Sequence, residues 1–364
     1  MAWLALADRS GRRLSLRGLG SDKREEPRLP DDPRHLLTRG SIMLETRMSP
    51  DGRPQVLFGY TTIHPWHRSL VFQAIPGGGI AMVQVQGKEI THAAIQHKNS
   101  GRTDVLRITY SWDSPSRWGR LTLEQPEAAT LISVAVENPS PLSLQDVRAL
   151  MLGQGSHDFA SDVVFAALSN EIEPIGITPT LSGDVPIATP WGYRRADTLL
   201  RGDTVYTHSG EVVPVLHTVT RTVPARGSFA PIRLRAPYYG LKQDIVVAPD
   251  QRVVIDGPEV EYMFNQESVL TPARHLVNGF AALDAHCGPT IAYTQVILPG
   301  HETMMVANAP LESLFVGRIR RNMPQLEASV LNGIDRNTLP EHGRESHKVL
   351  KWYEAISLAK RRAA

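Results

Sequence analysis

Between residues 40 and 136 the sequence is a series of short β-forming runs separated by turns that contain Gly or Pro, and no helical stretch lies between them. Two of these turns, at residues 49–52 and 76–79, join runs that are each long enough for one strand. The runs cover residues 41–48, 55–59, 69–73, 80–85, 104–112, 118–124 and 130–136. Such strands pair antiparallel and need a second layer to bury their apolar face. The pattern predicts an N-terminal jelly-roll-like β-sandwich over residues 40–140.

A change of pattern follows the sandwich. Residues 141–151 place apolar side chains at helical spacing after Ser143, which predicts a short helix capped by that serine. The rest of residues 141–174 is expected to be a linker with a helical turn near residues 163–168. Prolines and a glycine then favour a domain boundary near residue 175.

Short β-forming runs return over residues 175–321 and predict a second, all-β domain. Two helical candidates interrupt them, at residues 272–278 and 311–314. Residues 322–364 predict a tail that ends in a helix. Its apolar side chains recur at helical spacing and are expected to pack on the body of the protein: Val349, Trp352, Tyr353 and Ile356.

The first 39 residues have little periodicity and are rich in charged residues and proline, which predicts a partly disordered leader. Residues 1–8 are apolar, but they lack the positive region and the length of a signal peptide. We therefore expect a cytoplasmic location, or export by a route without an N-terminal signal. No stretch approaches the ~18 apolar residues of a membrane-spanning helix.

Composition excludes several classes of partner. The 364 residues carry a formal net charge of +2, so no electrostatic attraction to nucleic acid is expected. The single cysteine, Cys287, excludes an internal disulfide and any zinc site built from several cysteines. No phosphate-binding glycine motif is present, and we expect no cofactor.

The sandwich region also resembles a known fold. Tyr110-Ser-Trp-Asp113 and Arg117-Trp-Gly-Arg-Leu121 carry the similarity, which is to the concanavalin-like lectin and laminin-G type of jelly roll. Such folds often bind sugars, so the resemblance implies a glycan or surface ligand as one candidate partner.

Four segments of the second domain carry a more specific pattern. They read Ile187-Ala-Thr-Pro-Trp-Gly192, Asp197-Thr-Leu-Leu-Arg-Gly-Asp-Thr-Val205, Asp244-Ile-Val-Val-Ala-Pro-Asp-Gln-Arg-Val-Val254 and Leu298-Pro-Gly-His-Glu302. Together they resemble the Hedgehog/intein (Hint) domain of bacterial type. The resemblance implies an all-β Hint fold and autoprocessing akin to protein splicing, in which a side chain attacks the carbonyl of the preceding residue.

The resemblance also assigns positions to that chemistry. The family's opening cysteine lies seven residues before Ile187, where this chain has Thr180, so the bond at issue is Pro179–Thr180. Ser182 is the nearest other hydroxyl. An alcohol is a poorer nucleophile than a thiol near neutral pH, because very little of its anion exists.

The proton-transfer positions differ from the family as well. The Thr/Ser-x-x-His element falls on Ala248-Pro-Asp-Gln251, and the amide of Gln251 does not titrate. His301 occupies a position where the family often keeps a histidine that assists the reaction. These departures predict a degenerate active site with little or no self-cleavage.

Other groups of chemically active residues have ordinary structural interpretations. Metal binding needs three or four converging ligands, and neither histidine pair offers a third. Cys287 follows a histidine directly, and adjacent residues rarely face one another. The tryptophans can stack on a sugar ring or fill a core. The groups are His64 with His67, His92 with His97, His286 with Cys287, and Trp66, Trp112 and Trp118.

Two functional hypotheses remain open from the sequence. The first is an autoprocessing module, largely silent, with Thr180 as nucleophile and His301 assisting. The alternative is a non-catalytic binding protein that recognises a glycan or surface through its sandwich. The sequence does not fix the oligomeric state.

Overall fold

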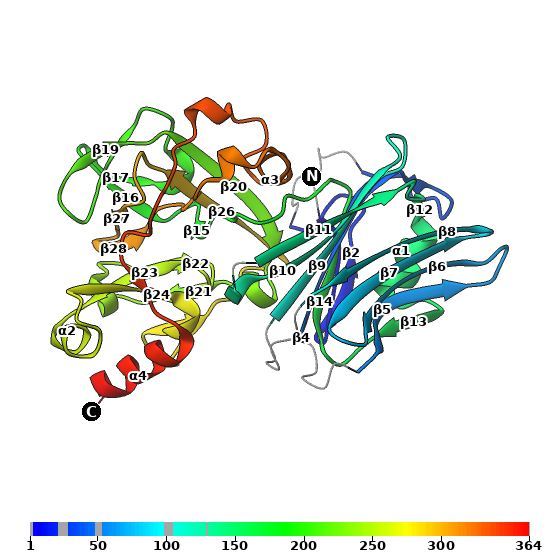
Figure 1. Cartoon of the computed structure of the whole chain (residues 1–364), viewed down its shortest axis with the longest axis horizontal. Helices are drawn as coiled ribbons and strands as arrows, with labels where there is room; N and C mark the ends of the chain where they lie inside the picture. Colours follow the sequence, from blue (N-terminus) through cyan, green and yellow to red (C-terminus); the bar gives the residue numbers. More distant parts are fainter. Residues whose placement is uncertain (1–2, 21–27, 48–52, 98–104, 129, 364) are drawn as a thin grey trace. The chain divides into compact units, whose positions relative to one another are not determined.

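The computed structural model describes residues 3–20, 28–47, 53–97, 105–128 and 130–363. The predicted turn at residues 49–52 lies outside these ranges. The chain divides into two compact units, Met1–Ile175 and Gly176–Ala364. Antiparallel strands dominate both units, so the prediction of a mostly β protein with a C-terminal helix is confirmed (Figure 1).

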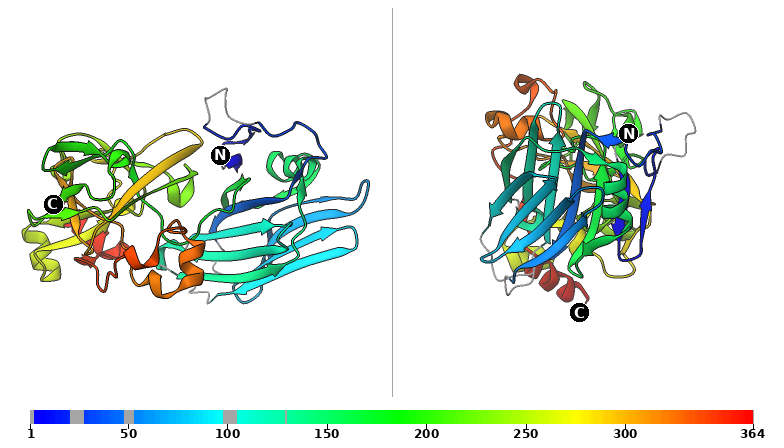
Figure 2. Two further views of the ribbon diagram at one scale, coloured as in Figure 1. Left: turned by 90° about the horizontal axis from the view of Figure 1, so that it is seen from above. Right: turned by 90° about the vertical axis from the view of Figure 1, so that its right-hand side faces the viewer.

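The N-terminal unit is a sandwich of two antiparallel sheets (Figures 1 and 2). The first contains, in spatial order, β11 (Thr130–Glu137), β10 (Trp118–Gln125), β9 (Val105–Asp113), β4 (Arg39–Arg47), β14 (Val163–Ser169), β1 (Trp3–Asp8) and β2 (Gly11–Leu14). The second contains β13 (Ser156–Phe159), β5 (Gln55–Thr62), β6 (Arg68–Ile75), β7 (Gly79–Gln86) and β8 (Glu89–Gln96). A short ladder joins β3 (Leu36–Leu37) to β12 (Leu142–Ser143), and η1 (Pro126–Ala128) precedes β11. The core lies between the sheets, where Phe58 and Phe72 stack.

Two predictions for this unit need correction. Strand β1 is paired on both sides, with β14 and with β2, so residues 3–14 belong to the sandwich and not to a leader. Strand β14 occupies residues that were expected to form a helical turn in the linker. Its apolar run, Val163–Leu168, fits a buried strand because the strand lies between β1 and β4.

Helix α1 (Leu144–Leu152) is confirmed with its predicted cap. Ser143 Oγ accepts the Asp146 N–H at 3.1 Å, and Asp146 Oδ2 accepts the Ser143 N–H at 3.3 Å, which forms a capping box. Asp146 also forms a buried ion pair with Arg68, at 2.9 Å between Nε and Oδ1. Gly153 ends the helix in the left-handed conformation that glycine adopts without steric cost.

The C-terminal unit contains two larger sheets. The first contains β20 (His217–Pro224), β26 (Thr290–Ile297), β15 (Leu181–Ser182), β22 (Ile245–Val247), β21 (Ile232–Leu234) and β25 (Ala282–Asp284). The second contains β17 (Gly192–Arg195), β16 (Pro186–Thr189), β27 (Thr303–Val306), β28 (Ala309–Glu312), β23 (Arg252–Asp256), β24 (Ser268–Pro272) and β29 (Lys348–Val349). A hairpin joins β18 (Thr204–Tyr206) to β19 (Val212–Pro214). Both larger sheets contribute to one apolar core, which includes Leu181 and Val253.

Helices in this unit are short. They are α2 (Pro258–Phe264), α3 (Met323–Ala328) and α4 (Trp352–Ala363), with 3-10 turns η2 (Ala196–Thr198), η3 (Gly227–Phe229), η4 (Tyr238–Gly240), η5 (Ala273–His275), η6 (Ile319–Arg321) and η7 (Arg336–Thr338). The helix predicted at 272–278 is the single turn η5. The helix predicted at 311–314 is wrong, because that segment begins in β28, which pairs with β27.

The C-terminal helix α4 packs differently from the prediction. Ala355 and Leu358 are buried against the core of the C-terminal unit. Trp352, Tyr353 and Ile356 are between 43% and 49% exposed, so the predicted apolar stripe is not the packing face. Ala355 is small and Leu358 lies beyond the predicted stripe, so the spacing of the larger apolar residues did not identify the packing face.

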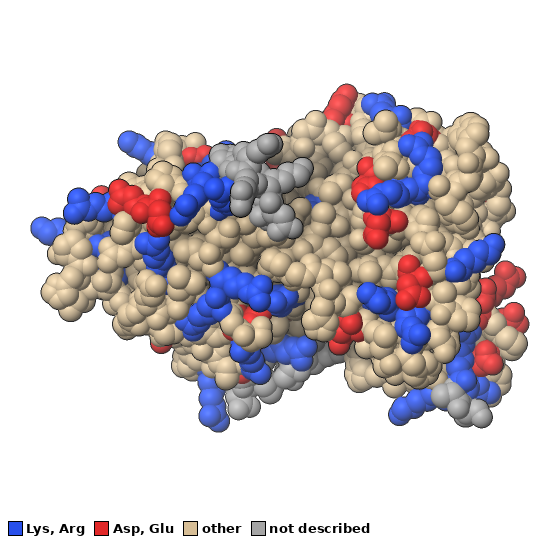
Figure 3. Space-filling model, turned by 180° about the vertical axis from the view of Figure 1, so that it is seen from behind, with Lys and Arg blue, Asp and Glu red and all other residues tan. Residues whose placement is uncertain are grey.

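Two further features concern the charged side chains on the surface and the length of the helices. On the face drawn in Figure 3, basic and acidic side chains are interspersed among uncharged ones. Within the described ranges, no helix combines the length and the apolar character needed to cross a bilayer.

Candidate functional site

Strand pairing places Thr180 beside β26 in the C-terminal unit, where it is half-buried. The short strand β15 lies between β26 and β22, with Leu181 opposite Thr294. In this antiparallel register the residue before Leu181 faces the residue after Thr294, which is Gln295. The carbonyl of Thr180 accepts the backbone N–H of Ala248 at 2.7 Å. The backbone of Thr180 is thus held from one side, while its side chain approaches Gln295.

A turn brings Gln251 to the same point. The Gln251 N–H donates to the Ala248 carbonyl at 3.0 Å, so Pro249 and Asp250 form the corner of this turn. The Thr180 hydroxyl donates to Gln251 Oε1 at 2.6 Å. A second acceptor, Gln295 Oε1, lies 3.3 Å from the same hydroxyl. One threonine hydroxyl therefore faces two amide oxygens.

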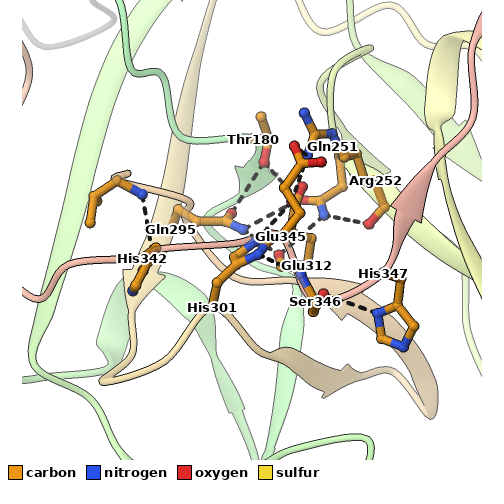
Figure 4. Close-up of polar contacts among 11 residues, drawn as sticks. Thr180, Gln251, Arg252, Gln295, His301, Glu312, His342, Glu345, Ser346 and His347 are labelled. Atoms are coloured by element: carbon orange, nitrogen blue, oxygen red, sulfur yellow. Dashed lines mark hydrogen bonds and ion pairs between the residues drawn. The ribbon is translucent and has the colours of Figure 1, made fainter. Parts of the chain in front are cut away.

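The two glutamine side chains are held by their own hydrogen bonds. Gln251 Nε2 donates to the carbonyls of Arg252 at 2.8 Å and Glu312 at 3.2 Å. Gln295 Nε2 donates to the Glu312 carbonyl at 2.7 Å and lies 3.4 Å from Gln251 Oε1 (Figure 4). Both glutamines are only 1% exposed. Because each nitrogen faces a carbonyl, each amide oxygen is turned toward Thr180, and this assignment of the amides follows from the network.

The carbonyl of Glu312 accepts from the two glutamines, whereas its carboxylate lies among other charged side chains. Its carboxylate oxygen Oε1 lies 2.9 Å from Arg252 Nη1 and 2.8 Å from His301 Nε2. Arg252 Nη1 also contacts Glu345 Oε1 at 2.8 Å. The His301–Glu312 approach is a close polar contact and not an aligned hydrogen bond, since Nε2 has no partner of hydrogen-bond geometry. His301 Nδ1 accepts the Ser346 N–H at 3.0 Å (Figure 4).

His342 borders this charged group. Its Nδ1 accepts the Val316 N–H at 3.2 Å, and its Nε2 lies 3.1 Å from the Leu298 carbonyl. The neutral ring satisfies both contacts, with Nε2 as donor. Burial lowers the pKa of His342 below its ordinary value, and the nearby His301 adds to this effect.

The structure treats the four predicted site residues differently. Thr180 and Gln251 are in direct contact. His301 reaches them only through Glu312, whose side chain contacts His301 while its carbonyl accepts from Gln251. Ser182, in β15, lies opposite Tyr293 of β26. The Ser182 hydroxyl makes no hydrogen bond within the described residues.

Four residues of the cluster are absent from the sequence-based site: Arg252, Gln295, Glu312 and Glu345. Gln295 lies in a predicted strand, but its partner depends on a pairing between segments more than 100 residues apart, which no local pattern reveals. Glu312 was assigned to a helix, and only the β27–β28 hairpin turns its carboxylate toward His301. The sequence offered one signal for Gln295, which is a polar residue within an otherwise apolar strand and therefore a candidate for a buried polar contact.

The other candidate groups stay apart from this cluster. No group of three or more potential metal ligands occurs among the residues that the structure describes. Cys287 is free and exposed. Trp112 is fully buried, whereas Trp66 is 54% and Trp118 is 38% exposed. Both of these sandwich tryptophans have an arginine over the ring: Arg68 lies 5.0 Å from the Trp66 centroid and Arg120 lies 5.6 Å from the Trp118 centroid.

The arrangement limits what the Thr180 hydroxyl can do. A hydroxyl attacks a carbonyl efficiently only when a neighbouring base removes its proton. The partners of this hydroxyl are amide oxygens, which do not take up a proton near neutral pH. The imidazole of His301 is occupied by the Ser346 N–H on one side and faces Glu312 on the other.

Comparison with known proteins identifies the second domain. Residues 179–318 match the family model of the Hint domain, so the predicted Hint resemblance is confirmed. The comparison with curated proteins finds no match.

Solved structures with similarity to parts of the chain are distant. A carbohydrate-binding module (CBM40) of the Ruminococcus gnavus IT-sialidase is 13% identical, with a TM-score of 0.28 and coverage of 37% of this chain and 77% of that chain. The MchDnaB-1 intein (N145AA) is 13% identical, with a TM-score of 0.26 and coverage of 36% and 98%. The LG1-3 region of the laminin alpha2 chain is 10% identical, with a TM-score of 0.25 and coverage of 85% and 66%. No TM-score here reaches 0.5, so the Hint assignment depends on the family match.

Proposed function

We propose that the Hint domain at residues 179–318 keeps the architecture of a self-processing domain but performs little or no cleavage at the Pro179–Thr180 bond. The observation that supports this most directly is the 2.6 Å hydrogen bond from the Thr180 hydroxyl to Gln251 Oε1. An acceptor of this kind orients the hydroxyl without activating it.

Two further features support a silent site. General acid–base catalysis typically contributes about a hundredfold to ten-thousandfold in rate, and no titratable side chain hydrogen-bonds to Thr180 within the described residues. The second feature is the nucleophile itself, since a threonine hydroxyl forms its anion far less readily than a cysteine thiol. In this proposal the Hint domain serves as a folded scaffold, and hydrogen bonds to amide oxygens hold its opening residue without activating it.

Intact-mass spectrometry of the purified full-length protein tests the proposal. We expect a single species at the mass of the whole 40.2 kDa chain after several days at pH 7 and at pH 9, with or without hydroxylamine. Self-cleavage at Pro179–Thr180 would instead give two fragments of similar mass, and their appearance in the unmodified protein would overturn the proposal.

Restoring the missing groups provides the converse test. The triple variant Thr180→Cys, Ala248→Thr, Gln251→His supplies the thiol, the hydroxyl and the imidazole that the family pattern calls for. We expect it to release the N-terminal fragment when a strong thiol is added. The matched control is Thr180→Cys alone, which has the nucleophile without the proton-transfer group. Equal cleavage of the two variants would show that the glutamine is not what silences the site.

The glycan-binding alternative is favoured by the partly exposed indoles of Trp66 and Trp118 on the sandwich, each of which has an arginine over its ring. Exposed indole rings commonly stack on sugar rings. A glycan array with the full-length protein, repeated with Trp66→Ala, tests it. Loss of a binding signal in the variant would support the alternative, and no signal above background for the unmodified protein would remove it.

A further inference from the structure

The C-terminal unit contains a cavity that shares no residue with the Thr180 cluster. Its volume is about 910 Å³, and residues from β23, β24, η4, η5 and α4 line it. Most of the lining is apolar, and includes Val254, Ile255, Leu276, Met305, Ile356 and Leu358. A cavity of this size and character can enclose much of a small apolar molecule.

A buried hydroxyl in the cavity wall has no partner. Thr271, in β24, is 1% exposed and lines the cavity. Its Oγ1 makes no hydrogen bond to any residue that the structure describes. Removing a hydroxyl from water without replacing its hydrogen bond is unfavourable, so buried hydroxyls almost always have partners. The oxygen is also closed to solvent, so this hydroxyl does not offer a contact to a molecule in the cavity.

His275 adds a second polar group to the wall. Burial, with a smaller effect of the neighbouring Arg274, lowers the pKa of His275 to about 4. The ring is therefore neutral at physiological pH and presents one donor and one acceptor. This wall consequently favours a hydrogen-bonding group over a second positive charge.

Aromatic side chains form an exposed part of the wall. Tyr238 and Phe280 meet edge to face with ring centroids 5.8 Å apart, and they are 42% and 55% exposed. Tyr239 lies beside them, and its hydroxyl donates to the Leu276 carbonyl at 3.4 Å. Exposed aromatic rings at the wall of an apolar cavity favour a flat ligand that stacks or packs on their faces.

The charges on the cavity wall select the sign of the ligand. Lys360 lines the cavity, and its ammonium group has no ion-pair partner within the described ranges. Arg362 also lines it, donates to the Asp256 carbonyl and lies 3.8 Å from Glu259 Oε2. The side chain of Asp256 is the one carboxylate in the lining. Because Arg362 already has the Glu259 carboxylate beside it, the Lys360 ammonium is the cation of the lining with which an anionic group on the ligand can pair.

We propose that this cavity binds a flat, mostly apolar small molecule that bears one carboxylate and one hydrogen-bonding group. The carboxylate pairs with Lys360, the ring packs among the apolar and aromatic side chains, and the hydrogen-bonding group meets the neutral ring of His275. This site is independent of the Thr180 cluster, so it stands whether or not the Hint domain cleaves itself.

A fluorescence titration of the full-length protein tests the site with 2-naphthoate as the probe. We expect saturable binding with a dissociation constant below about 1 mM, in line with the affinity available to a ligand of this size. Val277→Trp fills the cavity and should abolish binding. Val212→Trp is the matched control, because Val212 is an exposed valine outside the cavity. No binding at 1 mM, or equal binding by the two variants, would overturn the proposal.

The charge and the imidazole are tested separately. Lys360→Ala should weaken 2-naphthoate about fivefold or more without weakening the neutral 2-naphthamide, while Lys351→Ala should change neither. His275→Phe should weaken 6-hydroxy-2-naphthoate by about threefold to tenfold and weaken 2-naphthoate by less, because only the former carries a second hydrogen-bonding group. Identical affinities of the acid and the amide would contradict the role of Lys360, and equal losses for the two naphthoates in His275→Phe would contradict the role of the imidazole.

Discussion

The Thr180 cluster has two halves with opposite chemistry. The neutral half consists of Thr180, Gln251 and Gln295, which are joined by hydrogen bonds among uncharged groups. The charged half consists of Arg252, Glu312 and Glu345, which are joined by ion pairs, together with His301, whose ring contacts Glu312.

Glu312 belongs to both halves through different atoms. Its carbonyl accepts from both glutamines, and its carboxylate contacts Arg252 and His301. A single residue therefore connects a half that fixes geometry to a half that holds charge. Proton-transfer groups are present in the charged half, but they are not in contact with the hydroxyl that would need them.

The largest expected effect comes from the centre of the charged half. Glu312→Gln removes a carboxylate that is 10% exposed and leaves Arg252 and His301 without it. Arg252 keeps Glu345 as a partner, so its charge is not left unpaired, but its hydrogen bond to the Glu312 carboxylate is lost, and we expect a loss of about 1.5–3 kcal/mol in the free energy of unfolding. Chemical denaturation measures it.

Glu345→Gln is the matched control for this change. Glu345 contacts the same Arg252 nitrogen at a similar distance, but its side chain is 38% exposed. Water screens this pair, so the loss should stay below about 1 kcal/mol. Equal losses in the two variants would show that burial does not distinguish the charged half from a surface pair.

The neutral half should be the next most sensitive. Gln251→Leu takes the 2.6 Å acceptor from the Thr180 hydroxyl and a donor from the Arg252 carbonyl. We expect a loss of about 1–3 kcal/mol by chemical denaturation, since buried polar groups are left unpaired. Gln295→Leu should give a loss of similar size. A stabilised Gln251→Leu would mean that the neutral half is not a structural network.

A pH titration of stability tests His342, which borders the charged half. The folded pKa of His342 is below its ordinary 6.5 because of burial, so the unfolded chain binds a proton that the folded chain does not. The free energy of unfolding should therefore decrease as the pH falls below about 6.5. His342→Gln should make this decrease shallower between pH 7 and pH 5, whereas Gln251→Leu should leave its slope unchanged. A slope that is the same in His342→Gln would rule out this assignment.

The smallest effects are expected at the hydroxyls. Thr180→Val removes the hydrogen bond from the hydroxyl to Gln251 Oε1. That oxygen still has Gln295 Nε2 as a donor at 3.4 Å, so it is not left unpaired, and we expect a loss of about 0.5–1.5 kcal/mol. Ser182→Ala should change the stability by less than about 0.5 kcal/mol, because its hydroxyl makes no hydrogen bond within the described residues. A loss in Ser182→Ala that matches Thr180→Val would place Ser182 inside the network.

Local patterns in the sequence predicted much of this molecule. Turn residues and short β-forming runs gave the two β-rich units, and Ser143 gave the N-terminus of α1. The family pattern placed Thr180 and Gln251 at corresponding positions, and the two side chains are in contact. Each of these inferences depends on residues close together in sequence or on a motif.

Features that depend on pairing between distant segments were not predictable. The apolar residues of β1 suggested no partner, since β14 lies beyond residue 160. The same holds for Glu312, whose role depends on the register of a hairpin and on the approach of Arg252 from another strand. Local propensity does not contain this information, because side-chain packing across strands decides it.

The pairing of β1 with β14 has a consequence for how the protein is made. Trp3–Asp8 leaves the ribosome early, but its partner Val163–Ser169 emerges only after most of the sandwich has been translated. At the typical ~5–20 residues per second, this strand waits roughly 10–30 s with one edge unpaired. During that interval the nascent chain exposes an unpaired strand edge, which is a site where other chains can pair with it.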